Sequence, residues 1–432
     1  MRILAKDMKD AAQRGEKGVR VCGWVHRVRE LGALSFVLLR DRSGIVQLVL
    51  NEKCAVALES VIAAEGEPAL NEKAPGGAEL RVAHLECISR AAADLPFQVN
   101  GDPAKTSLEA ILDNRLLSLR NPKIRAIFKV QAAIVEAFSA HLRAQDFTEI
   151  KTSKLVAGST EGGAELFHVE YFDKKVCLAQ SPQFYKQTMV ASGLERVFEV
   201  APAYRAEKHD TPRHLNEYVS LDVEMAFIES ERDLIELEKG ILAHIFEEVN
   251  RKCAAELALW GAAAPTPESV ERSPIVGYEE AVNIANEGAA RTKGGRIFDL
   301  NPEAERHICE WAEKEHGSAL AFVNEFPRRY RPFYTYPLDA TRTMSFDALF
   351  RGLEITTGGR RQHDYAAFLE TLPKFGLKAE DFEGGYLTLL KYGCPPHGGF
   401  AIGCERLTAR ILGLANVKEA SLFPRDRKRI SP

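Results

Sequence analysis

Three segments far apart in the chain place arginine beside carboxylate inside otherwise apolar runs, and this pattern restricts the possible folds more than any other feature. The segments are 198–224, 345–361 and 398–407. A buried charge costs free energy unless it is paired or meets a charged ligand or a metal. We therefore expect the segments to converge on one site for a polyanion and a divalent cation, and a nucleoside triphosphate with magnesium fits that description.

Composition and charge narrow the class of protein. The 432 residues are 45% hydrophobic and 27% charged, which is ordinary for a globular chain of two to three domains. No apolar run approaches the ~20 residues of a membrane span, the N-terminus has no signal-peptide pattern, and the eight cysteines form no Cys-x-x-Cys pair. We expect a cytoplasmic protein with reduced thiols. The net charge is −4, but 20–42 carries an excess of three positive charges, either a solvated strand face or a nucleic-acid patch.

Periodicity predicts two domains of an α+β protein. Residues 1–90 contain about five short alternating strands, which favour a small β-barrel of the oligonucleotide-binding type, and 91–122 form a polar linker. From 123 to 432 we expect a domain with an antiparallel sheet flanked by helices, beginning with a long amphipathic helix that ends near Gln145. An insertion or flap is predicted at about 254–300. Further elements are expected as strands at 167–171, 175–178, 197–204, 218–227, 319–322, 344–350, 353–356 and 399–402, and as helices at 231–253 and from 405.

The first charged segment has the residues of a phosphate site. Arg205 and Glu207 are two apart, so on a strand they face the same side, and the arginine fork suits a phosphate or a carboxylate. Arg213 and His214 follow in a polar loop that could reach terminal phosphates. The alternative is a surface hairpin with incidental charges.

The other two segments add candidate magnesium and anion ligands. Asp347, Glu354 and Thr357 could hold Mg²⁺ while water and phosphates complete its octahedron, or the carboxylates could pair with Arg351 in the core. In the third segment, glycines precede Glu405 at a strand-to-helix junction, where a helix N-terminus attracts anions.

These segments resemble the motifs of class II aminoacyl-tRNA synthetases, with the first and third similar to motifs 2 and 3. The string Gln-Ser-Pro-Gln-Phe-Tyr-Lys-Gln at 180–187 resembles the amino-acid signature of aspartyl-tRNA synthetases. The resemblance covers essentially the whole chain, whose compact length is similar to the archaeal and eukaryotic type of subclass IIb. It implies a homodimer that uses ATP and Mg²⁺ to convert L-aspartate to aspartyl-adenylate and then transfers the aspartyl group to the 3′ end of tRNA(Asp).

The resemblance also implies roles for individual residues, with Arg205 and Arg406 as the catalytic pair. Residues implied for ATP are Arg205, Glu207, Arg213, His214, Leu215, Glu354, Gly403, Cys404, Glu405 and Arg406; for aspartate, Glu161, Gln183, Lys186, Arg205, Thr357 and Arg361; for magnesium, Glu354, Thr357 and Asp347. Lys186 and Arg361 would meet the substrate β-carboxylate. An asparagine amide would leave two buried cations poorly matched, which would exclude it without editing.

The barrel is then expected to read the anticodon. Phe36 resembles the residue that stacks on the middle base and Gln47 the residue that reads its edge. His26 and Pro75 occupy positions where strict enzymes of this type tend to carry a tryptophan and a lysine, so we expect a looser, non-discriminating pocket. Such an enzyme would also charge tRNA(Asn), and a partner amidotransferase would convert the product. The alternatives are an asparaginyl-tRNA synthetase, a synthetase-derived asparagine synthetase and a catalytically silent RNA-binding protein.

Overall fold

The computed structural model describes residues 2–92, 94–158, 166–208, 210–291, 295–382 and 385–432. The chain divides into two compact units, Met1–Ala110 and Ile111–Pro432. In the described ranges, no helix combines the length and the apolar character that a membrane crossing requires.

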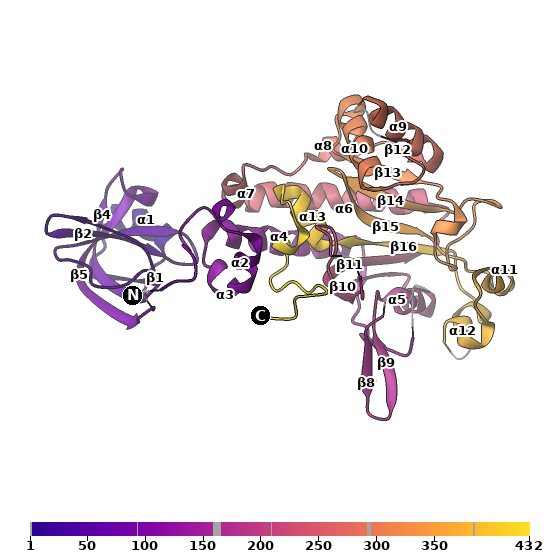
Figure 1. The fold of residues 1–432 in the computed structure, drawn as a ribbon, viewed down its shortest axis with the longest axis horizontal. Helices are drawn as coiled ribbons and strands as arrows, with labels where there is room; N and C mark the ends of the chain where they lie inside the picture. Colours follow the sequence, from indigo (N-terminus) through magenta and orange to yellow (C-terminus); the bar gives the residue numbers. More distant parts are fainter. Residues whose placement is uncertain (1, 93, 159–165, 209, 292–294, 383–384) are drawn as a thin grey trace. The chain divides into compact units, whose positions relative to one another are not determined.

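The first unit is a closed barrel with the strand order β1-β2-β3-β5-β4 (Figure 1). Inward-facing residues such as Val19, Val21 and Val37 alternate with partly exposed ones and fill the barrel core. The predicted barrel is therefore confirmed. Its elements are η1 (Ala5–Asp7), α1 (Met8–Gln13), β1 (Val19–Leu31), β2 (Leu34–Arg40), β3 (Ile45–Leu50), β4 (Val61–Leu70), η2 (Pro75–Gly77), β5 (Ala78–Ser89) and η3 (Pro103–Lys105).

The second unit is built on an eight-stranded sheet with the order β12-β13-β14-β15-β16-β11-β10-β6. Its central pairs are antiparallel, and only the outermost pairs, β12 with β13 and β10 with β6, are parallel. The predicted antiparallel α+β architecture is confirmed. The strands are β6 (Thr148–Glu149), β10 (Arg196–Tyr204), β11 (Glu217–Ala226), β12 (Ile275–Gly277), β13 (Leu320–Asn324), β14 (Ser345–Phe350), β15 (Leu353–Arg360) and β16 (His397–Gly403).

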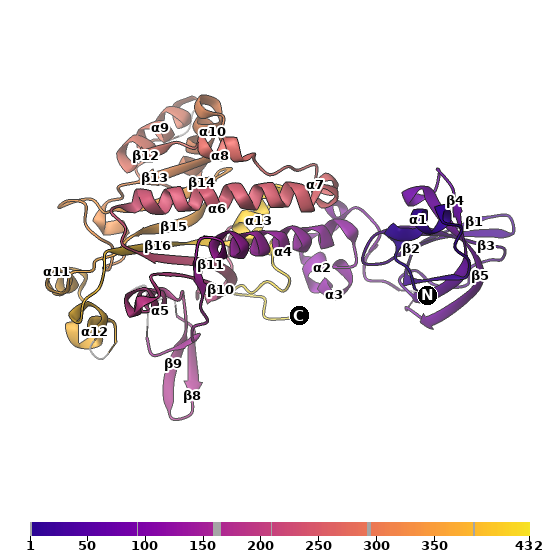
Figure 2. The same ribbon diagram turned by 180° about the vertical axis from the view of Figure 1, so that it is seen from behind.

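Three helices cover one face of this sheet. Figure 2 shows α4 (Pro122–Arg143) and α6 (Glu231–Lys252) running along it, and α13 (Cys404–Leu412) packs into the same core. The Asn121 side chain caps α4 ahead of a first-turn proline, and Ser230 with Asp233 forms a capping box on α6. These caps explain why the two helices begin where the sequence predicted.

Smaller elements complete the second unit. A three-stranded sheet, ordered β7-β9-β8, stands beside the main one. The remaining elements are α2 (Leu108–Asp113), α3 (Arg115–Ser118), β7 (Leu155–Val156), β8 (His168–Tyr171), β9 (Lys174–Leu178), α5 (Gln183–Met189), η4 (Val190–Leu194), α7 (Ala254–Trp260), α8 (Pro267–Glu271), α9 (Tyr278–Arg291), α10 (Pro302–His316), η5 (Arg328–Tyr330), α11 (Tyr365–Thr371), η6 (Leu372–Phe375), η7 (Ala379–Phe382), α12 (Tyr386–Lys391) and η8 (Val417–Ala420).

Two regions differ from the sequence expectation. The expected linker 91–122 contains α2 and α3, and buried Arg115 ties α3 to the C-terminal segment through the carbonyls of Glu419, Ser421 and Leu422. The expected insertion at 254–300 contains three helices and β12, which forms one edge of the main sheet. A three-residue strand is too short to show an alternating pattern, and for that reason the sequence did not reveal it.

Candidate functional site

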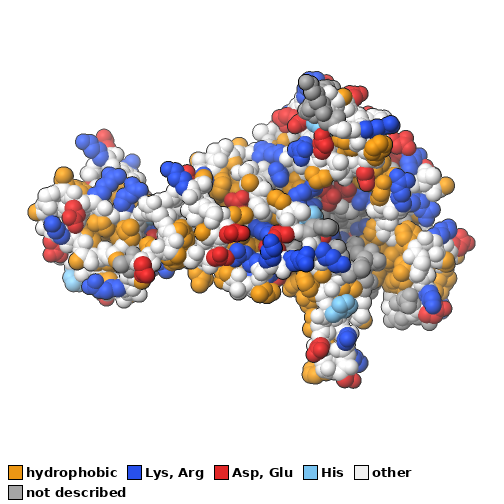
Figure 3. Space-filling view, in the orientation of Figure 1, with side chains coloured by type: hydrophobic (Ala, Val, Ile, Leu, Met, Phe, Trp, Pro, Cys, Tyr) orange, Lys and Arg blue, Asp and Glu red, His pale blue; other side chains and the backbone are white. Residues whose placement is uncertain are grey.

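A cavity of about 180 Å³ opens on the sheet face that α4 and α6 leave uncovered. Ser220 and Asp222 line it, whereas Leu221 and Val223 pack into the helix-covered core, as strand alternation requires. Figure 3 shows charged side chains of both signs around a hollow on this face. The cavity is lined by Gln183, Lys186, Arg205, Glu207, Arg213, His214, Leu215, Glu354, Thr357, Arg361, Gly403, Glu405 and Arg406, among others. The predicted convergence of the three charged segments is therefore confirmed.

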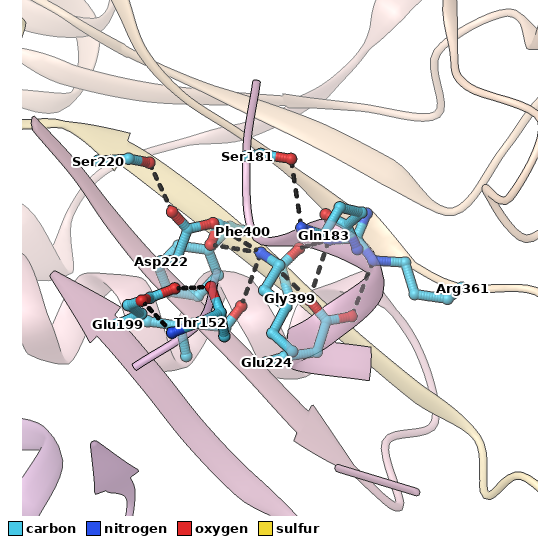
Figure 4. A network of polar contacts seen from close by, with 12 residues as sticks. Thr152, Ser181, Gln183, Glu199, Ser220, Asp222, Glu224, Arg361, Gly399 and Phe400 are labelled. Atoms are coloured by element: carbon cyan, nitrogen blue, oxygen red, sulfur yellow. Dashed lines mark hydrogen bonds and ion pairs between the residues drawn. The ribbon is translucent and has the colours of Figure 1, made fainter. Parts of the chain in front are cut away.

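The floor of the cavity is formed by Lys186, Asp222 and Arg361, and Glu224 lies buried beneath it. Figure 4 labels Asp222, Glu224 and Arg361 of this network. Lys186 Nζ lies 3.0 Å from Asp222 Oδ1 and 3.2 Å from Glu224 Oε2. Arg361 donates from Nε to Glu224 Oε1 at 2.9 Å and from Nη2 to Glu224 Oε2 at 3.2 Å. Burial acts to raise the pKa of Glu224, but Arg361 and Lys186 outweigh it, so the pKa is lowered and the carboxylate remains ionised.

This floor corrects one sequence expectation. Lys186 and Arg361 were expected as two buried cations that would meet the substrate β-carboxylate and would be poorly matched by an asparagine amide. In the structure each already contacts a carboxylate, and the charges of the four side chains balance. The two cations therefore have carboxylate partners before any ligand binds.

Gly399 permits the close packing of this floor. It lies on β16 opposite Glu224 on β11. A Cβ at Gly399 would lie 2.0 Å from the Val223 carbonyl oxygen and 2.2 Å from Glu224 Oε2. Its own carbonyl accepts from Arg361 Nη2 at 2.8 Å. Any larger residue would push the glutamate away from Arg361, so the glycine is required by the ion pair.

Arg205, Arg213 and Arg406 also line the cavity, and we call this part of its lining the phosphate wall. Arg406 Nη1 donates to the Glu354 backbone oxygen at 2.9 Å and to Glu354 Oε1 at 3.2 Å. Arg213 Nη2 donates to both carboxylate oxygens of Glu305 at 2.6 Å. The Asn216 side chain donates to the Arg205 carbonyl at 2.9 Å, which fixes the start of the loop that carries Arg213. This wall can bind phosphates through several guanidinium groups.

Of the residues predicted to bind ATP, Glu405 has a backbone partner for its side chain and Cys404 has a buried side chain. The Glu405 carboxylate accepts the Val219 backbone N–H at 3.0 and 3.1 Å, and burial raises its pKa to about 7. The Cys404 thiol is fully buried, and burial raises its pKa well above the usual value. Any contact of Cys404 with a nucleotide would therefore use its backbone.

The candidate magnesium ligands are only partly available. In the described ranges, no three or more His, Cys, Asp or Glu side chains cluster as a metal site. Glu354 and Thr357 line the cavity, whereas Asp347 contacts Arg331 Nη2 at 2.8 Å, and burial raises the Asp347 pKa to about 7. Mg²⁺ commonly uses one or two carboxylates and leaves its other positions to water and phosphate. Glu354 and Thr357 fit that pattern, and Asp347 lies opposite Thr357 in the strand register.

In the barrel, Phe36 and Gln47 lie on a partly exposed outer face. The strand register places Arg29 beside Phe36, and Gln47 donates to Glu79 Oε2 at 2.8 Å. Pro75 is exposed at the start of η2. Aromatic and basic side chains on one open sheet face suit the stacking of single-stranded bases.

His26 differs from its expected place. It occupies a bulge between Val25 and Arg27, and its ring is buried, with 8% of the residue exposed. The Nδ1 atom lies 2.9 Å from Arg40 Nη1, and Arg40 in turn pairs with Glu59. A bulge interrupts strand alternation, so the ring faces the interior. Burial and then Arg40 lower the His26 pKa to about 4. A direct contact between this ring and a base is not supported.

Two known protein families together match most of the chain. The family described as tRNA synthetases class II (D, K and N) matches residues 107–427, and the OB-fold nucleic acid binding domain matches residues 19–88. The chain belongs to the class II tRNA synthetases.

Relatives of this synthetase span its full length. It is 47% identical to the aspartate–tRNA(Asp/Asn) ligase of Thermus thermophilus over 100% of both chains. It is 39% identical to the aspartate–tRNA(Asp) ligase of Pyrococcus horikoshii over 96% of each. Among solved structures, the asparaginyl-tRNA synthetase of P. horikoshii with asparaginyl-adenylate superimposes with a TM-score of 0.88 at 33% identity, covering 97% of this chain and 96% of the other.

Sequence reasoning missed several residues of the synthetase's cavity. Arg331 and Tyr334 line it, and the run of cations and aromatics at 328–334 was a usable signal. Glu305 joins the wall from α10, and nothing in that helix's regularly spaced charges distinguished it. Glu161, predicted to hold the substrate ammonium group, lies outside the described residues.

Proposed function

We propose that this synthetase is an aspartate–tRNA ligase that uses ATP and Mg²⁺. The observation that carries the proposal is that one cavity joins a floor suited to a carboxylate with a wall suited to phosphates. The full-length relatives named as aspartate–tRNA ligases support the choice of aspartate. The barrel face with Phe36 and its basic neighbours supports a tRNA anticodon as the partner of the first unit.

The reaction needs positioning more than acid–base chemistry. An oxygen of the aspartate α-carboxylate attacks the α-phosphorus of ATP, the bond to pyrophosphate breaks, and aspartyl-adenylate forms. A hydroxyl of the terminal tRNA ribose then attacks the aspartyl carbonyl, and AMP leaves. Arg205 would hold the α-phosphate, while Arg213 and Arg406 would hold the other phosphates as charge moves onto them. Magnesium at Glu354 and Thr357 would neutralise phosphate charge.

The second candidate is an asparaginyl-tRNA synthetase, because a structure of that activity shares the fold. Pyrophosphate exchange with each amino acid separates the two. We expect aspartate to support exchange with a kcat/KM at least about a hundredfold above that of asparagine, since a mismatched buried polar floor discriminates strongly. A preference for asparagine would reverse the assignment.

We further propose that the enzyme charges both tRNA(Asp) and tRNA(Asn), with an amidotransferase to convert the second product. The relatives named as tRNA(Asp/Asn) ligases and the donor-free, exposed Pro75 support this. The kcat/KM values for the two transcripts provide the test. A preference above about a thousandfold would reject the idea, since one base contributes roughly 1–3 kcal/mol to such readout. In a Pro75→Lys variant, which adds a donor, we expect charging of tRNA(Asn) to fall more than charging of tRNA(Asp).

The proposal also includes a homodimer in the cytoplasm, as the family resemblance implies. Sedimentation equilibrium of the full chain tests the oligomeric state. A monomer at micromolar concentration would reject that part alone and would leave the chemistry of the cavity unaffected.

A further inference from the structure

Glu305 on α10 does not itself line the cavity, but it contacts Arg213, which does. The residue is buried, with 5% exposed. Its two carboxylate oxygens accept from Arg213 Nη2 at 2.6 Å each, and Oε2 also accepts the Glu354 backbone N–H at 2.8 Å. One side chain therefore joins α10, the loop that carries Arg213, and strand β15.

The contacts continue to a second arginine. The backbone N–H of Glu354 donates to Glu305. The backbone carbonyl of the same residue accepts from Arg406 Nη1 at 2.9 Å. Arg213 and Arg406 both line the cavity. Glu305 contacts Arg213 directly, and it contacts Glu354, whose carbonyl accepts from Arg406. It is therefore connected to both proposed phosphate ligands.

The charge of Glu305 cannot itself favour a triphosphate. A carboxylate beside the wall repels phosphate oxygens and offsets the positive charge of Arg213. What the residue can add is position. An arginine side chain loses much rotamer freedom when it is fixed, and a side chain that is fixed before the ligand arrives does not lose that freedom on binding.

The local structure gives Arg213 little other support. Its backbone N–H donates to Thr211 Oγ1 at 3.3 Å, and Thr211 Oγ1 lies 2.6 Å from His214 Nδ1. These contacts shape the loop but do not hold the guanidinium group. In the described part of the chain, Glu305 is the carboxylate that pairs with the Arg213 guanidinium group.

We propose that Glu305 is a positioning residue of the ATP site, which fixes Arg213 and the Glu354 peptide in the geometry that the phosphates meet. The helix α10 is then a working part of that site through Glu305. This inference rests on the proposed ligase function.

The test compares Glu305→Ala with Glu310→Ala in pyrophosphate exchange by the full chain. Glu310 lies on the same helix with 70% of its side chain exposed, which makes it a matched control. For Glu305→Ala we expect the KM for ATP to rise about tenfold while the KM for aspartate changes less than twofold. Glu305→Gln, which keeps one acceptor oxygen, should fall between that variant and the parent. Equal increases in both KM values, or no increase for ATP, would overturn the proposal.

A double-mutant cycle asks whether Glu305 acts through Arg213. Arg213→Ala should itself raise the KM for ATP. Adding Glu305→Ala to it should then change that KM less than threefold, and a full tenfold further rise would reject the role through Arg213. Melting temperatures of all variants identify any general loss of folding, and Glu305→Gln serves if Glu305→Ala does not fold.

A binding measurement separates this inference from the ligase assignment. Titration calorimetry with MgATP needs no amino acid or tRNA. If the parent chain shows no aspartate-dependent exchange, the ligase proposal fails, yet weaker MgATP binding by Glu305→Ala than by Glu310→Ala would still support the positioning role. Equal binding by the two variants would overturn it.

Discussion

The two units of this synthetase each bury an arginine against a glutamate, with different consequences. In the barrel, Arg40 pairs with Glu59 through two nitrogens at 2.7 and 3.0 Å. In the main sheet, Arg361 pairs with Glu224 in a similar two-point contact. All four residues are nearly inaccessible. The arginine of the barrel pair contacts the buried His26 ring, whereas the arginine of the sheet pair lines a cavity.

The difference teaches that a buried ion pair does not by itself indicate a functional site. The Arg40–Glu59 pair contacts the buried His26 ring inside the barrel, so we expect it to contribute to folding. Arg361 lines a cavity together with Arg205, Arg213 and Arg406, so a ligand can reach this arginine, while Glu224 lies buried behind it. The cavity and the additional cations, and not the burial of charge, distinguish the second case.

The largest expected effect tests the functional side of this comparison. Arg361→Lys keeps the charge but loses the planar fork, so we expect kcat/KM for aspartate in pyrophosphate exchange to fall about a thousandfold, with the KM for ATP nearly unchanged. Arg360→Lys is the matched control, since Arg360 donates to the Glu229 carbonyl at 2.7 Å. A loss of kcat/KM under tenfold in Arg361→Lys would contradict a functional role for the Arg361–Glu224 pair.

The barrel pair should behave in the opposite way. Arg40→Met leaves Glu59 as a buried, unpaired carboxylate, and we expect the free energy of unfolding of the barrel to fall by about 3–5 kcal/mol. Exchange at 25 °C should persist because it needs no anticodon contact. Replacing both partners, as in Arg40→Met with Glu59→Leu, should cost less than the single change. Denaturant unfolding measures the first effect, and loss of exchange in the folded variant would contradict the assignment.

His26 allows a test by pH. Its pKa is near 6.5 when unfolded but lowered to about 4 in the barrel, so the unfolded chain binds more protons between these values. Stability is therefore lost as pH falls from 6.5 towards 4, by roughly 2–3 kcal/mol at pH 4.5. The barrel of a His26→Asn variant should show a flatter dependence. An unchanged slope between pH 6.5 and 4.5 would mean that the ring is not buried as described.

The smallest effect concerns a buried acid that, among the described residues, hydrogen-bonds to a hydroxyl and not to a cation. Glu238 on α6 accepts from Thr356 Oγ1 at 2.6 Å, and burial raises its pKa to about 8. Its carboxyl is therefore protonated when folded at neutral pH but ionised when unfolded, so stability is lost as pH rises from about 4.3 to 8. Glu238→Gln should raise stability at pH 5.5 by about 1–2 kcal/mol and leave it nearly unchanged at pH 4. Thermal unfolding at the two values checks this, and destabilisation at pH 5.5 would show that the acid is ionised.

The comparison also explains how far the site could be predicted. Strand alternation around Val19 and Val37 and the helical spacing of 124–142 are local properties, and both predictions were confirmed. The three charged segments indicated a shared pocket because buried charges need partners. The sequence could not show which partner each charge takes, since Arg361 and Glu224 are 137 residues apart.

The amino-acid sequence by itself determined the barrel, the antiparallel sheet with its long helices, and the residue types that meet in the cavity. Tertiary structure alone decided that Lys186 and Arg361 are already neutralised, that the His26 ring faces inward at a bulge, and that Glu305 joins the wall. Secondary-structure periodicity follows from neighbours within one turn or one strand. Charge pairing depends on distances of a few ångströms between residues far apart in the chain, and only the folded arrangement fixes those distances.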